Sequence, residues 1–203
     1  MNAPIAELQQ LIENSQLSEA EQKARLWVQE NPEEIEARIT LGRILGMRGK
    51  NTEAATQFEE ALQIDDKHFE ATFYLAIANE TQKKYEEAIE IYKKALNLNQ
   101  NTARIHYRLG RIYNNYEFSG KSEFLALFHL RQATTSENPP EGAFLELATI
   151  GPLSRSVYVL QNGLNRHPQS LQLHERLSWY LYRLEKYADC VAAIESAYKQ
   201  GLD

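Results

Sequence analysis

The strongest constraint on this chain is that it resembles itself at an interval of 34 residues. Residues 35–68 align with residues 69–102 without a gap, and residues 103–113 continue the same frame. The matched positions carry similar side chains: Leu41-Gly42 with Leu75-Ala76 and Leu109-Gly110, Ala54 with Ala88, Phe58 with Tyr92, and Ala61 with Ala95. A period of this length predicts an array of stacked units, each of which packs on its neighbours.

Each unit has the pattern of two consecutive helices. In the first half, large apolar residues recur three or four positions apart, which places them on one helix face. A small residue (Gly42, Ala76 or Gly110) follows the leucine there, and it lets the second helix approach closely. The second half alternates small residues with one bulky residue, Phe58 or Tyr92. We therefore expect an all-α fold made of antiparallel helix pairs.

Units of this kind cover the whole chain as one domain, 1–203, although not with equal regularity. We expect boundaries near residues 1–34, 35–68, 69–102, 103–140, 141–170 and 171–203. A long turn from Asn114 to Lys121 makes the fourth unit irregular. The fifth is short and is broken at Gly151-Pro152, because proline has no amide hydrogen with which to continue a helix. Whether residues 141–170 form a true repeat is left open.

With these residues the chain resembles the tetratricopeptide-repeat (TPR) family, whose pattern is aromatic, Leu-Gly, Tyr, then Ala, Phe and Pro. The residues that carry the resemblance are His106, Leu109-Gly110 and Tyr113 in a first helix, and Tyr85, Ala88, Tyr92 and Ala95 in a second. His106 stands where the family has Trp. The resemblance implies a right-handed superhelical solenoid whose first helices line a concave groove.

Composition argues against a membrane protein or a nucleic-acid-binding protein. No apolar run approaches the roughly 20 residues that span a bilayer. The net charge is −6, so the chain as a whole does not have the excess of basic residues that nucleic-acid-binding proteins show. The N-terminus has no basic start followed by an apolar segment, so we expect a cytoplasmic protein.

The search for catalytic chemistry finds no signature. The five histidines include no pair at the helical spacing of metal ligands, and Cys190 is the single cysteine. Gly-x-Ser-x-Gly and phosphate-loop motifs are absent from the sequence. We interpret His106 and Cys190 as packed residues, and we expect no catalytic, cofactor-binding or metal-binding residues.

The resemblance places candidate partner-binding residues on the first helices. These are Arg43, Phe73, Ile77, Arg104, Tyr107, Arg108, Arg111 and Asn115, and the last unit adds Trp179, Tyr182 and Arg183. Arg104, Arg108 and Arg111 share one helix face because they stand at i, i+4 and i+7. Guanidinium groups suit carboxylates. Two interpretations stay open: the arginines pair with acids of their own surface, or they bind acidic side chains or a free C-terminal carboxylate of a partner.

The leading functional hypothesis is a non-catalytic scaffold or adaptor that binds a peptide or protein segment in its concave groove. The alternative is a TPR interaction or regulatory domain of a larger enzyme, such as a transferase, with the chain truncated after Asp203. A third hypothesis is a homo-oligomer formed through the C-terminal end, where Ala188, Val191 and Ala192 would be partly bare.

Overall fold

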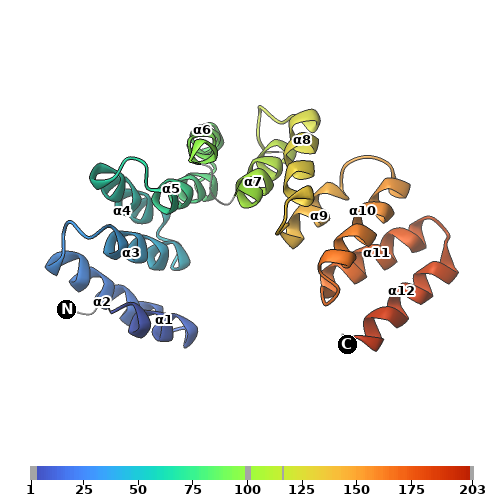
Figure 1. Cartoon of the computed structure of the whole chain (residues 1–203), viewed down its shortest axis with the longest axis horizontal. Helices are drawn as coiled ribbons and strands as arrows, with labels where there is room; N and C mark the ends of the chain where they lie inside the picture. Colours follow the sequence, from blue (N-terminus) through green and yellow to red (C-terminus); the bar gives the residue numbers. More distant parts are fainter. Residues whose placement is uncertain (1–3, 99–101, 116, 202–203) are drawn as a thin grey trace. The chain divides into compact units, whose positions relative to one another are not determined.

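The computed structural model describes residues 4–98, 102–115 and 117–201, and within these ranges the chain forms twelve α-helices and no strand (Figure 1). The helices are α1 (Ile5–Glu13), α2 (Leu17–Glu30), α3 (Ile35–Met47), α4 (Asn51–Ile64), α5 (Phe69–Thr81), α6 (Tyr85–Asn97), α7 (Thr102–Asn114), α8 (Glu123–Thr135), α9 (Glu141–Leu147), α10 (Leu153–Arg166), α11 (Leu171–Arg183) and α12 (Tyr187–Lys199). Each predicted unit contains one pair of consecutive helices. The all-α repeat fold is therefore confirmed.

The helices divide into two compact units by their internal contacts. Residues 1–100 form unit 1, with α1 to α6, and residues 101–203 form unit 2, with α7 to α12. The expectation of one domain over 1–203, wound as a right-handed superhelix, stays a prediction.

In unit 1 the small and bulky positions of the repeat have the predicted packing roles. Ala54 and Ala61 on α4 are buried, and Phe58 between them is also buried. A Cβ atom on Gly42 would lie 2.6 Å from the ring of Phe58. The absence of a side chain at Gly42 therefore makes room for the ring of Phe58 against α3.

Unit 2 repeats this arrangement where α7 meets α8. A Cβ atom on Gly110 would lie 2.6 Å from Cγ of Leu130, and Leu130 is fully buried. Its core continues through Phe144, Leu160 and Leu173 of the following helices. Close helix contact at a small residue is thus common to both units.

Both predicted irregularities occur in unit 2. The turn between α7 and α8 extends from the end of α7 at Asn114 to the start of α8 at Glu123, and residue 116 lies outside the described residues. α9 has only seven residues, since Pro139-Pro140 precedes it and Gly151 follows with a φ of 97°. Positive φ favours glycine, so the chain turns there and α10 begins after Pro152.

Candidate partner-binding surfaces

Three predicted binding residues lie in unit 1, and two of them reach the surface. Arg43 is exposed, and its guanidinium carbon lies 5.4 Å from the ring centroid of Tyr74. Ile77 is half-buried. Phe73 is only 3% exposed, and its ring packs 6.1 Å from that of Tyr92 on α6. The placement of Phe73 on a binding surface is therefore corrected, because the side of α5 that carries it faces α6.

In unit 2, the predicted residues of α7 differ in their surroundings. Arg104 is exposed and Arg108 is half-buried. The guanidinium of Arg111 lies 5.6 Å from the ring centroid of Tyr107, and its Nε is 3.8 Å from Oε1 of Glu146 on α9. The first interpretation from the sequence, that the arginines pair with acids of their own surface, therefore describes Arg111, whose guanidinium lies beside the carboxylate of Glu146.

Asn115 has a local role at the end of α7. Its side-chain oxygen accepts a hydrogen bond of 2.9 Å from the amide of Glu117, as Asn commonly does where a helix gives way to a turn. This hydrogen bond helps to shape the long turn. The predicted role of Asn115 in partner binding would therefore come in addition to this structural role.

A hollow of about 540 Å³ lies between α9 and α11 of unit 2. Its lining residues are Leu145, Gln172, Glu175, Arg176 and Trp179. The indole of Trp179 is 47% exposed. It has Tyr180 edge-on at 4.8 Å between ring centroids, and the guanidinium carbon of Arg183 at 5.1 Å. An exposed tryptophan beside charged groups is a common anchor of protein interfaces.

Polar contacts hold α9 in place and so shape this hollow. The carbonyl oxygen of Ala148, just after α9, accepts hydrogen bonds from the hydroxyl of Ser156 at 2.6 Å and from that of Tyr180 at 3.0 Å. These bonds satisfy a carbonyl that has no partner within so short a helix. They link the end of α9 to α10 and to α11.

Helix α9 contacts α7 and also lines the hollow. A Cβ atom on Gly142 of α9 would lie 2.3 Å from the hydroxyl oxygen of Tyr107, so α7 and α9 are in close contact. Leu145 in the hollow is next in sequence to Glu146, which faces Arg111. The surface that α7, α9 and α11 form together is called here the first-helix face of unit 2.

The sequence alone indicates only part of this face. It predicts Trp179 at the binding surface, but not Leu145, Gln172 or Arg176. A helical spacing that could have indicated the rest of the face is nonetheless present in the sequence. Four residues stand at i, i+3, i+4 and i+7 and so share one side of a helix: Gln172, Glu175, Arg176 and Trp179.

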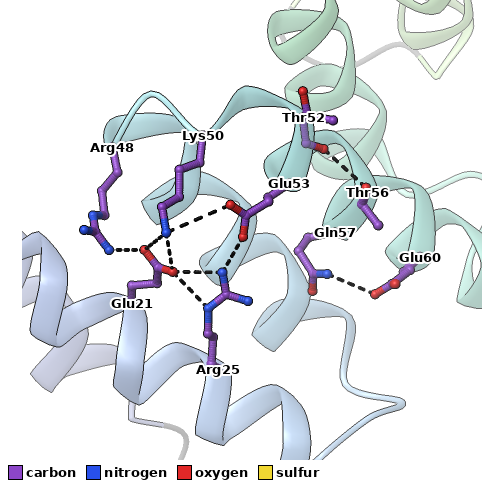
Figure 2. A network of polar contacts seen from close by, with 9 residues as sticks. All are labelled: Glu21, Arg25, Arg48, Lys50, Thr52, Glu53, Thr56, Gln57 and Glu60. Atoms are coloured by element: carbon purple, nitrogen blue, oxygen red, sulfur yellow. Dashed lines mark hydrogen bonds and ion pairs between the residues drawn. The ribbon is translucent and has the colours of Figure 1, made fainter.

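A buried carboxylate in unit 1 forms the centre of a polar network that joins α2 to the start of α4 (Figure 2). The carboxylate of Glu21 accepts hydrogen bonds from Arg25 at 2.9 Å, from Lys50 at 2.9 Å and from Arg48. Burial disfavours the charged carboxylate, but these donors outweigh it and lower the pKa of Glu21 from 4.5 to about 2. Arg25 also pairs with Glu53. The network is a structural link between neighbouring repeats.

Two histidines form a second polar contact, between α7 and α8. Nδ1 of His106 lies 2.9 Å from Nδ1 of His129, so one ring donates a hydrogen bond and the other accepts it. The ring of His129 stacks on Tyr113 at 5.7 Å between centroids. Burial lowers the pKa of His106 below its ordinary value, which favours its neutral form. His106 is thus a packed residue, in keeping with its interpretation from the sequence.

Within the described part of the chain, no three His, Cys, Asp or Glu side chains gather closely enough to hold a metal ion. Cys190 is half-buried, and its thiol donates to the carbonyl oxygen of Ser178 at 3.3 Å. Among the described helices, none has both the length and the apolar character that crossing a bilayer requires.

Comparison with known proteins agrees with this architecture. Residues 81–115 match the sequence profile of the TPR repeat. A search of curated protein sequences found no match.

The fold is similar to those of several solved structures. A thermophilic TPR protein of Thermus thermophilus is 22% identical with a TM-score of 0.69, over 88% of this chain and 97% of that one. The pilF protein of Pseudomonas aeruginosa is 20% identical with a TM-score of 0.69, over 82% of this chain and 76% of that one. YrrB, described as a TPR protein with an unusual peptide-binding site, is 18% identical with a TM-score of 0.58, over 89% and 93%.

The shared architecture defines the fold class of this chain. The chain is an all-α helical-repeat protein. One segment, residues 81–115, matches the TPR repeat profile, and the chain shares its helical-repeat fold with solved TPR proteins.

Proposed function

We propose that this chain is a non-catalytic scaffold that binds a segment of another protein on the first-helix face of unit 2. The observation that carries the proposal is the hollow of about 540 Å³ between α9 and α11, whose helix α9 also contacts Arg111 of α7 through Glu146. YrrB, a structure of similar fold, is described as having a peptide-binding site, which supports the same general role here. Arg43 and Ile77 of unit 1 are proposed as further partner contacts.

The chemistry of the face favours a peptide with two features. An apolar side chain would pack against Trp179 and Leu145, where aromatic and aliphatic surface is available in a partly enclosed site. An acidic side chain or a C-terminal carboxylate would reach Arg104 and Arg108. Hydrogen bonds to charged groups contribute about 1.5–3 kcal/mol when partly desolvated, against about 0–1 kcal/mol for exposed ion pairs.

Peptide selection tests this proposal and does not require that the partner be identified first. The whole chain serves as bait for a displayed library of random peptides, and the dissociation constants of selected synthetic peptides are measured by fluorescence anisotropy. We expect the double variant Arg104→Ala/Arg108→Ala to bind at least about tenfold more weakly, roughly 1.4 kcal/mol. Added salt should also weaken the wild-type complex. Trp179→Ala should reduce affinity independently of salt.

A matched control removes two positive charges from elsewhere in unit 2. Lys121→Ala/Arg131→Ala alters exposed positions in the turn before α8 and on α8 itself, and its affinity should stay within about twofold of wild type. Equal affinities for wild type and the Arg104/Arg108 variant, with unchanged helicity, would assign these arginines to surface pairing. The cytoplasmic location and the alternative role within a larger enzyme stay predictions.

A further inference from the structure

The outer side of α12 carries a row of exposed apolar side chains. Tyr187, Val191, Ile194 and Tyr198 are between 43% and 64% exposed, and they stand at i, i+4, i+7 and i+11, which places them on one face. This row is called here the α12 stripe. The adjacent side of the helix is already used, since Cys190 and Ala193 pack against the core of unit 2. The helix therefore has a second apolar face beyond the one that holds it to its own unit.

The repeat register shows what kind of object fits this stripe. Ile194 occupies the repeat position of Phe58 on α4, because Cys190 and Ala197 match Ala54 and Ala61. Phe58 is 3% exposed, and its ring stacks on Tyr74 of α5 at 5.7 Å between centroids. In unit 1 this position is thus covered by another helix, so the α12 stripe has the form of a helix-binding surface.

The symmetry of the stripe indicates its occupant. Its spacing of four, three and four residues reads the same in both directions, with a tyrosine at each end and a β-branched residue at each central position. Two antiparallel copies of α12 around a two-fold axis would therefore set Tyr187 against Tyr198 of the second copy and Val191 against Ile194. A two-fold interface requires such self-complementarity. Ala188 and Ala192, which are small and exposed beside the stripe, allow the two helices to approach closely.

Helix α1, at the other end of the repeat array, does not present an equivalent row of exposed large apolar side chains among its described residues. The exposed positions of α1 include Glu7, Gln9, Gln10 and Glu13. A head-to-tail contact would bury these polar groups against the stripe without hydrogen-bond partners, which is costly. The stripe thus matches itself better than it matches the opposite end of the chain.

We propose that the protein forms a two-fold homodimer through antiparallel pairing of the α12 stripes. Four side chains per copy make a small interface, so we expect a weak dimer whose population depends on protein concentration. The proposal concerns a surface formed by second helices and is independent of peptide binding on the first-helix face.

Sedimentation velocity of the whole chain tests the dimer. As the protein concentration rises from about 1 μM to about 500 μM, a range suited to a weak dimer, the wild-type protein should shift from monomer to dimer. Val191→Glu and Ile194→Lys should each weaken association at least tenfold. The matched control Tyr158→Glu changes a residue of α10 that is 65% exposed, and it should dimerise like wild type. A wild type that stays monomeric throughout, or association that survives both stripe variants, would overturn the proposal.

Mixing the two stripe variants tests the antiparallel register. In a mixed dimer the introduced carboxylate of Val191→Glu would face the introduced ammonium of Ile194→Lys, while the other central pair stays as in wild type. The mixture should therefore regain dimerisation that neither variant has alone. If it stays monomeric, the proposed pairing is wrong. Should either variant lose helicity by circular dichroism, Tyr187→Ser/Tyr198→Ser replaces it, and dimerisation of that folded double variant at wild-type strength would refute the proposal.

Discussion

At the scale of single residues, Glu21 shows how a buried charge is stabilised by its neighbours. Its side chain is 7% exposed, and it receives hydrogen bonds from Arg25, Arg48 and Lys50. Glu21→Gln should lower the free energy of unfolding at neutral pH by about 1–3 kcal/mol, since the partly exposed partners are screened by water. Chemical denaturation of both proteins measures this loss.

The lowered pKa of Glu21 also sets the pH at which this stabilisation disappears. Because the folded pKa is about 2 and the ordinary pKa of the group is 4.5, the unfolded state binds the proton more readily. The contribution is therefore complete above pH 4.5 and is lost as the pH falls toward 2. The gap in stability between wild type and Glu21→Gln should narrow over that window. Glu13→Gln, at an exposed position of α1, is the control, and a gap that is independent of pH would contradict this account.

At the scale of helices, the contact of α7 with α8 depends on the missing side chain at Gly110. Alanine is the better helix former by about 1 kcal/mol, but a Cβ atom here would lie 2.6 Å from Cγ of Leu130 and 3.2 Å from its backbone nitrogen. Backbone cannot move aside as a side-chain tip can, and overpacking costs about 1–3 kcal/mol. We expect Gly110→Ala to lower the thermal midpoint.

Gly46 provides the matched comparison within α3. A Cβ atom there would meet nothing within 4 Å, so Gly46→Ala should be neutral or stabilising by up to about 1 kcal/mol. If both substitutions shift the midpoint in the same direction, helix propensity rather than packing controls these positions.

At the scale of the whole molecule, the two units differ in regularity, and this should show in unfolding. Unit 1 contains the uninterrupted repeats, whereas unit 2 contains the long turn before α8, the seven-residue α9 and the break at Gly151. Each unit has one of the two tryptophans, Trp27 and Trp179. Repeat arrays unfold according to local repeat stabilities, so we expect the Trp179 signal to change at a lower urea concentration than the Trp27 signal.

Single-tryptophan variants separate the two signals. Trp179→Phe reports on Trp27, which is buried and donates a hydrogen bond of 2.8 Å to Glu34, and Trp27→Phe reports on Trp179. Far-ultraviolet circular dichroism of each variant shows whether the substitution itself alters stability. Coincident transitions with both probes would mean that the whole chain unfolds as one cooperative body.

Much of the fold could be predicted from residues that recur every 34 positions. The register located the helix pairs and assigned packing roles to Gly42, Phe58 and Gly110, because close packing of two helices demands a small residue opposite a large one. It also indicated the break at Gly151-Pro152, since both residues disfavour helix for reasons local to the backbone. These features depend on neighbours in sequence or on one facing helix.

The candidate binding surface was less predictable because exposure depends on several helices at once. Phe73 and Arg43 both belong to first helices, yet Phe73 is directed into the core and only Arg43 is exposed. Arg111 carries its charge next to Glu146, which belongs to a different helix, α9. No pattern within α7 alone reveals that carboxylate.

The sequence by itself determined that this chain forms paired helices, that the fifth unit is broken near Gly151-Pro152, and which small residues allow helices to meet. Only the tertiary structure decided that α9 and α11 enclose a hollow beside Trp179, that three cations surround Glu21, and that one face of α12 stays open. The reason is physical. Helix formation and pairwise packing follow from local periodicity, whereas a hollow, a buried charge and an open face each depend on groups brought together from distant parts of the chain.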